Sequence, residues 1–156
     1  MKVVFNGSYQ SGFCLTEKAI LRCGELKGLT LYPEWKPQGL TTYWTVPPEQ
    51  RHGYLQGEAW RAATLTERKR SNEVYMALTH DWTQMARHDP VLIQVIEELG
   101  AAAVEYDVPT IAEIPDGSSY EVIQAPPSPY SPDYSEWISF IDAEGVTRIK
   151  VAADFR

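Results

Sequence analysis

Two glycines, Gly7 and Gly12, stand five residues apart between a short apolar run and the start of a helical pattern. A strand, then G-x-x-x-x-G, then a helix is the context of a phosphate-binding P-loop. That motif continues with Lys and Ser or Thr, which contact the phosphates and Mg²⁺, whereas this chain continues with Phe13 and Cys14. The sequence therefore predicts no nucleotide hydrolysis at this loop. Two interpretations stay open: the amides at the helix start face an anion, or the glycines only relieve a tight turn.

Histidines and carboxylates are the other groups with catalytic potential. His52 followed by His80 and Asp81 has the residue order of the HD-type metal phosphohydrolases, but those enzymes place their ligands on helices, and loop and strand are predicted here. Glu113 and Asp116 are a strand acid beside a turn acid, which is a common pairing without catalytic meaning. No G-x-S-x-G elbow and no Cys-His signature is present. We predict a protein without a catalytic residue, cofactor or metal, and a metal phosphohydrolase is the alternative.

Aromatic residues are abundant, with five Trp and nine Tyr, and many of them lie between residues 32 and 82. Rings with polar tips stack on bases and fill partner surfaces, and nearby Arg side chains hold anions by charge-assisted hydrogen bonds. Arg87 also precedes a predicted helix N-terminus, whose dipole favours negative charge. Alternatively, the aromatic residues fill the core and the basic residues are a solvated face. The candidate ligand-binding residues are Tyr43, Trp44, Arg61, Tyr75, Trp82, Arg87 and Asp89.

Two helices must position these residues. One is predicted from the N-cap Thr16 to Gly28, and the other from the N-cap Asp89, followed by Pro90, to Gly100. In the second helix Leu92, Val95, Ile96 and Leu99 form one apolar stripe.

Short apolar runs bounded by turn residues predict the strands. They are expected at residues 2–5, 29–32, 41–46, 73–79, 110–114, 120–123, 136–141 and 146–151, the last two as a hairpin. Residues 47–73 are expected to be loop with a short helix, and 125–134 a proline-rich excursion. This order predicts an α+β fold, a largely antiparallel sheet with two main helices packed on one face.

The composition limits the class of protein. A chain of 156 residues predicts a single domain, residues 1–156. The formal net charge of −7 argues against direct DNA binding, because the phosphate backbone is also negative. No apolar run reaches the ~20 residues of a membrane span, and the apolar run after Met1 is too short for a signal peptide. With only two cysteines, Cys14 and Cys23, the chain is expected in a reducing cytoplasm.

Three stretches together resemble a family of small accessory proteins encoded by phages and prophages. They are SGFCLTEKAILRCGELKGLTLY, RHDPVLIQVIEELG and AEIPDGSSYEVIQ, within residues 11–32 and 87–124. The family's usual ending, an acidic Tyr-Asp-Gly turn, is replaced here by the proline-rich segment and an extra hairpin. The order of elements is also similar to that of the sponge proteins that sequester nucleotide signals of Thoeris defence.

The resemblance implies a non-enzymatic, phage-encoded binding protein in the cytoplasm of an infected or lysogenic bacterium. Such a protein would counter host antiviral defence by sequestering a cyclic-nucleotide-type immune signal, with a small phosphorylated ligand as its partner. The alternative that it implies is a protein–protein inhibitor of a host defence enzyme. Similarity to the sponge proteins also implies a homo-oligomer.

Overall fold

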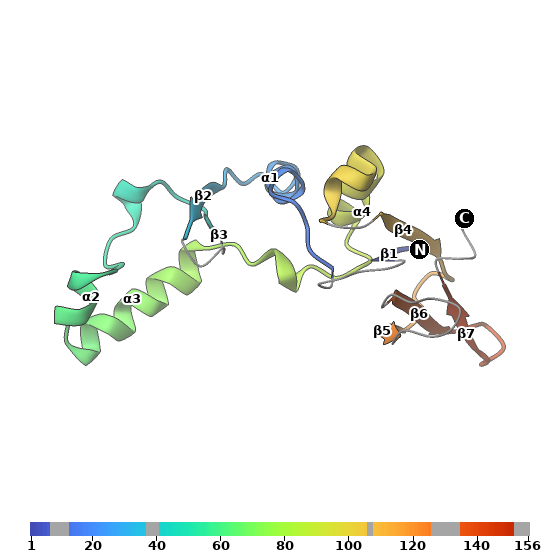
Figure 1. Ribbon diagram of the computed structural model, residues 1–156. Helices are drawn as coiled ribbons and strands as arrows, with labels where there is room; N and C mark the ends of the chain where they lie inside the picture. Colours follow the sequence, from blue (N-terminus) through green and yellow to red (C-terminus); the bar gives the residue numbers. More distant parts are fainter. Residues whose placement is uncertain (7–12, 37–40, 106–107, 126–134, 152–156) are drawn as a thin grey trace. The chain divides into compact units, whose positions relative to one another are not determined.

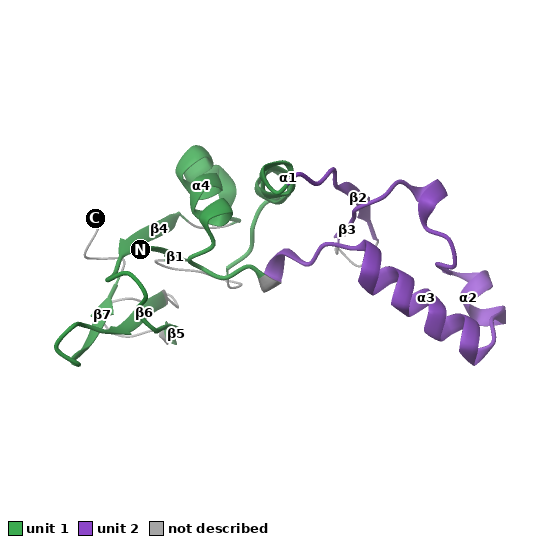
Figure 2. Ribbon diagram, turned by 180° about the vertical axis from the view of Figure 1, so that it is seen from behind, with its two compact units in different colours: residues 1–27, 85–156 green, residues 28–84 purple. Residues whose placement is uncertain are grey.

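The computed structural model describes residues 1–6, 13–36, 41–105, 108–125 and 135–151 (Figure 1). The chain divides into two compact units (Figure 2). Unit 1 comprises residues 1–27 and 85–156, and unit 2 comprises residues 28–84. The single domain stays a prediction, and residues 126–134 of the proline-rich excursion lie outside the described residues. Helices and antiparallel strand pairs make up the described parts of both units, which confirms the α+β class.

Unit 1 contains two antiparallel sheets. One pairs β1 (Lys2–Asn6) with β4 (Pro109–Glu113), and the other has β5 (Tyr120–Ala125), β6 (Ser135–Ile141) and β7 (Thr147–Lys150). The strands predicted from 110 to 151, including the hairpin, are thereby confirmed. Alternation along β1 places Val3 and Phe5 on one face, since successive side chains of a strand point to opposite sides. Both sheets contribute to one core: Val3, Phe5, Ala112, Ile114, Ile138 and Phe140.

The two main helices that the sequence predicts are present in unit 1. They are α1 (Glu17–Leu26) and α4 (Pro90–Leu99), and a 3₁₀ turn, η3 (Gly100–Ala103), follows the second. The Thr16 hydroxyl accepts a hydrogen bond from the Ala19 N–H, and the Asp89 carboxylate accepts one from the Val91 N–H. Each helix therefore begins at its predicted cap. The helix α4 buries Leu92, Ile93, Val95 and Ile96.

Unit 2 begins with the third sheet of the described residues, an antiparallel pair of β2 (Tyr32–Trp35) and β3 (Thr41–Trp44). The predicted strand at 29–32 was wrong in its position, because β2 starts at Tyr32 and runs through Pro33. Proline lacks an N–H, and a strand with one open edge tolerates that loss. After β3 come η1 (Pro48–Gln50), α2 (Glu58–Ala62), α3 (Leu65–Leu78) and η2 (Trp82–Gln84).

The helix α3 overturns the prediction of a strand at 73–79 and of loop before it. A capping box begins the helix: the Thr64 hydroxyl accepts from the Glu67 N–H, and the Glu67 carboxylate accepts from the Thr64 N–H. This reciprocal pair satisfies two amides that a helix start otherwise leaves open. The helix propagates from this start through EVYMAL, a mostly apolar run that resembles a strand when it is taken alone.

Candidate functional site

A cavity of about 310 Å³ in unit 2 brings together three of the predicted ligand-binding residues, Tyr43, Tyr75 and Trp82. Two segments distant in sequence form its walls. The strand β3 lies beside the end of α3, because the His80 N–H donates to the Tyr43 carbonyl and the Thr45 N–H to the Leu78 carbonyl, each at 2.8 Å. A backbone bridge between Trp44 and Thr79 continues the same contact.

The lining of this cavity combines aromatic and polar side chains. Besides the three rings it contains the side chains of Thr41, Thr42, Met76, Thr79, His80 and Asp81. The Thr79 hydroxyl donates to the Tyr75 carbonyl at 2.6 Å, and the Asp81 carboxylate accepts from the Thr83 N–H at 3.0 Å. The first bond closes the end of α3, and the second fixes the turn that carries Trp82. Small-molecule sites have this character, with rings that supply contact area and a few polar groups that set orientation.

Trp44, a fourth predicted residue, supports the cavity from behind instead of lining it. Its side chain is fully buried. Its ring meets Tyr54 and Tyr75 edge-on, at centroid distances of 4.6 and 5.6 Å. The Arg51 guanidinium carbon lies 4.2 Å from the Trp44 ring centroid. For Trp44 the alternative interpretation therefore holds: this aromatic residue fills the core.

Lys36 is a functional candidate that the sequence reasoning missed. It directly follows β2, and its Nζ lies 5.9 Å from the centroid of the Tyr75 ring, within the range of a cation–π contact. Tyr75 lines the cavity, so Lys36 brings a positive charge close to its wall. No local pattern marks this lysine, because its proximity to Tyr75 depends on the pairing of β2 with β3, which lies beside the end of α3.

Arg87, the residue expected to hold phosphate, is engaged in unit 1. Two of its guanidinium nitrogens contact the two carboxylate oxygens of Glu136, each at 2.8 Å, and Glu136 is 1% exposed. The Glu136 carboxylate also accepts from the Asn6 N–H at 2.9 Å. The guanidinium carbon of Arg87 lies 4.0 Å from the Phe13 ring centroid. These contacts give Arg87 a structural role in the described residues, and it does not join the cavity of unit 2.

The other two predicted residues also lie outside the cavity. Asp89 caps α4 and pairs with Lys27, with its Oδ2 3.3 Å from the lysine Nζ. Burial favours a higher pKa for Asp89, but the hydrogen bond from the Val91 N–H and the Lys27 ammonium outweigh it and lower that pKa below its ordinary value. Arg61 is exposed on α2 and pairs with Glu58 one turn earlier. The glycine loop at residues 7–12 lies outside the described residues.

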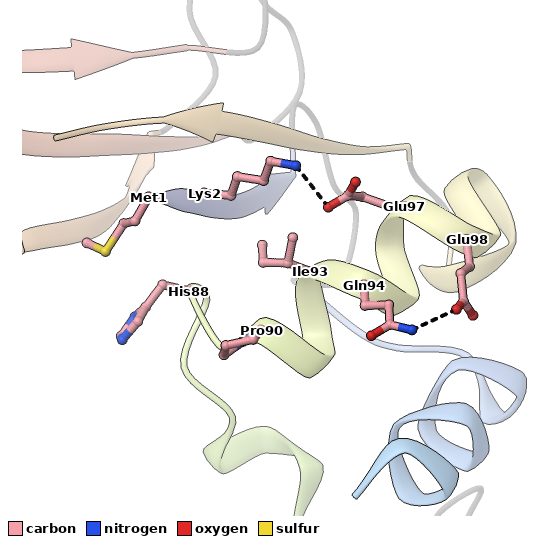
Figure 3. A pocket seen from close by; sticks show the side chains of 8 residues that line it. All are labelled: Met1, Lys2, His88, Pro90, Ile93, Gln94, Glu97 and Glu98. Atoms are coloured by element: carbon pink, nitrogen blue, oxygen red, sulfur yellow. Dashed lines mark hydrogen bonds and ion pairs between the residues drawn. The ribbon is translucent and has the colours of Figure 1, made fainter. Parts of the chain in front are cut away.

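A groove of about 510 Å³ lies in unit 1 between β1 and α4 (Figure 3). Lys2 reaches from β1 to Glu97 on α4, with 3.2 Å between Nζ and Oε1. The Gln94 amide donates to Glu98, which in turn pairs with Arg22 of α1 at 2.9 Å. Lys2, Glu97 and Glu98 of this groove are thus engaged in ion pairs, and none of the predicted ligand-binding residues lines it. We therefore take the smaller cavity of unit 2 as the candidate site.

Metal chemistry finds no support in the described residues. No three His, Cys, Asp or Glu side chains among them are grouped so that they could hold a metal ion. His52 is exposed in the turn after η1, whereas His80 and Asp81 follow α3. Nor does the described part of the chain contain a helix with the length and apolar character needed to cross a bilayer.

Comparison of the chain with protein-family models, with curated proteins and with solved structures finds no match.

Proposed function

We propose that this chain is a non-enzymatic binding protein that sequesters a nucleotide-type ligand in the cavity of unit 2. One observation carries the proposal: three aromatic residues and three threonines from β3, the end of α3 and the segment after it line a single cavity of about 310 Å³. Stacking of a base on an aromatic side chain contributes about 1–3 kcal/mol of binding free energy, and any of the bases can stack in this way. The threonine hydroxyls both donate and accept, so they suit the edge of a base or the hydroxyls of a sugar.

The phosphate of the ligand is assigned to Lys36. No Lys or Arg is among the described residues that line the cavity, so the phosphate of a bound nucleotide must extend beyond this lining to reach a cation. The Lys36 ammonium lies close to Tyr75 in the cavity wall. An ammonium group is a compact point charge that binds phosphate without a fixed geometry. A nucleotide would therefore place its base in the cavity and its phosphate at the cavity edge.

The distribution of charge favours unit 2 for an anionic ligand. Its sequence has six Lys or Arg and six Asp or Glu, so the formal net charge of −7 belongs wholly to the sequence of unit 1. Electrostatic repulsion of an anion is accordingly weaker at unit 2.

The three stretches that resemble a phage accessory family support a role in countering host antiviral defence. The ligand would then be a cyclic-nucleotide-type immune signal in the cytoplasm of the infected or lysogenic host, bound by a homo-oligomer.

Isothermal titration of the full chain with AMP, GMP, CMP and UMP, and with their 3′,5′-cyclic forms, tests the proposal. At least one of these ligands should bind, and Trp82→Ala should weaken its binding about tenfold or more through the lost stacking contact. Trp35→Ala is the matched control, because Trp35 is 69% exposed in the same unit and does not line the cavity. Absence of binding by the folded protein to every ligand of the panel contradicts the proposal.

A second candidate is the inhibitor of a host defence enzyme. It is favoured by three large apolar side chains that unit 2 exposes, Trp35 at 69%, Leu65 at 83% and Met76 at 75%. Exposed apolar residues of this size are typical of partner surfaces when they gather into a patch. In that case Leu65→Ser should abolish capture of the enzyme and leave nucleotide titrations unchanged.

A further inference from the structure

Unit 2 contains a second cavity, of about 300 Å³. It lies closer to the N-terminus of α3 than the cavity of Tyr43, Tyr75 and Trp82 does. Tyr75 lines both cavities. Asn72 lines the second cavity and Met76 the first, and their separation of four positions corresponds to about 6 Å along the helix axis. The two cavities are therefore neighbours that share one aromatic wall.

The second cavity has the chemistry of a ring-binding site of its own. Tyr54 and Trp60 join Tyr75 in its lining, and the amide side chains of Gln56 and Asn72 are beside them. A carboxamide presents a donor and an acceptor side by side, which matches the adjacent donor and acceptor on the edge of a base. Arg68 of α3 holds Trp60 in place. The Arg68 Nε donates to the Trp60 carbonyl at 2.9 Å, and the guanidinium carbon of Arg68 lies 5.6 Å from the centroid of the Trp60 ring.

Local packing also fixes the floor of the second cavity. The Leu55 N–H donates to the buried Ser71 hydroxyl at 2.8 Å, which ties the loop before α2 to α3. The Tyr54 and Tyr75 rings stack with an interplanar angle of 26° and a centroid distance of 6.1 Å. The rings and amides of this cavity are thus positioned before any ligand arrives, which lowers the entropy cost of binding.

Positive charge lies beside the second cavity. Arg68, Lys69 and Arg70 directly precede its lining residues Ser71 and Asn72 on α3, and the Arg68 guanidinium donates to the Trp60 and Arg61 carbonyls. A phosphate that links two rings would therefore meet basic side chains near this cavity as well as Lys36 near the first.

We propose that the cavity lined by Tyr54, Trp60 and Asn72 is a second base-binding subsite, so that the ligand carries two aromatic bases joined through phosphate. This inference rests on the proposed function, because it extends the same binding site. Linking two bases makes the second contact intramolecular, so a dinucleotide gains affinity over a mononucleotide without any new kind of contact.

The test compares each mononucleotide that binds with the 3′–5′-linked dinucleotide of the same base (ApA, GpG, CpC or UpU), by isothermal titration. The dinucleotide should bind one per chain, about tenfold or more tightly than the mononucleotide. Trp60→Ala and Asn72→Ala should each remove most of this gain and change mononucleotide affinity less than about twofold. Asn72 is exposed on a helix, where Ala is the most favourable residue, so Asn72→Ala keeps the test valid if Trp60→Ala unfolds α2.

Equal affinity of dinucleotide and mononucleotide for the wild-type chain would overturn the second subsite and leave the proposed function standing. So would a dinucleotide gain that survives both substitutions. Failure of the proposed function itself looks different, because then no mononucleotide binds at all.

Discussion

Arg87 and Glu136 are 49 residues apart in sequence, and they form a bidentate ion pair in which both nitrogen–oxygen distances are 2.8 Å. The pair joins the segment before α4 to the start of β6. It also fixes β1, because Glu136 accepts from the Asn6 N–H and the Arg87 carbonyl accepts from the Val4 N–H. An arginine next to a helix N-terminus is thus a structural element of unit 1.

Breaking this pair should destabilise the fold strongly. Arg87→Met leaves the buried Glu136 carboxylate without its cation, which typically costs about 3–5 kcal/mol in the free energy of unfolding. Adding Glu136→Gln removes the unpaired charge and keeps an oxygen for the Asn6 N–H, so the double variant should recover at least about 1 kcal/mol. Urea unfolding measures both values. Arg22→Met, at the exposed pair with Glu98, is the control and should leave the free energy of unfolding nearly unchanged. A double variant less stable than Arg87→Met would contradict this view of the pair.

Asp89 should make the stability of α4 sensitive to acid. The pKa of its carboxyl is lowered in the folded chain, so the unfolded state binds more protons in acid and the stabilisation is lost as the pH falls through this pKa. The contribution is fully present above the ordinary Asp pKa of about 3.9. Asp89→Asn keeps a capping side chain and removes the charge. The wild type should therefore melt at a higher temperature than this variant near neutral pH, and the difference should shrink below about pH 4. A difference in melting temperature that does not vary with pH would refute the assignment.

The two cysteines should differ in their reaction with iodoacetamide. Burial raises the pKa of the Cys23 thiol to about 11, and Cys23 is fully buried on α1. Burial and the Glu105 carboxylate also raise the pKa of Cys14, which is only partly buried. The thiolate is the reactive form, so both should alkylate slowly at neutral pH, Cys14 before Cys23. Mass spectrometry of the native chain measures the order, with a urea-unfolded sample as the control in which both react. Alkylation of Cys23 at the rate of Cys14 in the native chain would be the opposite result.

Much of unit 1 follows from local sequence signals. The caps Thr16 and Asp89 mark the starts of α1 and α4, and the turn at 142–145 marks the last hairpin. The helix α3 escaped prediction because Ser71 is its only fully buried described residue, so it lacks the apolar stripe by which a helix is recognised. Its capping box from Thr64 to Glu67 was the signal that could have revealed it.

The candidate site was predicted in its residue types but not in its assembly. Tyr43, Tyr75 and Trp82 were singled out as aromatic residues able to stack, and the cavity unites them. Their meeting depends on the pairing of β3 with the end of α3, which no local pattern specifies. The partner of Arg87 was missed for the same reason, since Glu136 lies far along the chain and no sequence spacing relates the two.

The most direct test of the central claim is to map nucleotide binding onto the backbone amides of the isotope-labelled chain by nuclear magnetic resonance. A mononucleotide should shift the amide signals of residues 41–43 and 75–82, which carry the lining of the cavity. Signals of the groove between β1 and α4 should stay unchanged. Shifts confined to unit 1, or no shift with any nucleotide at saturating concentration, would contradict it.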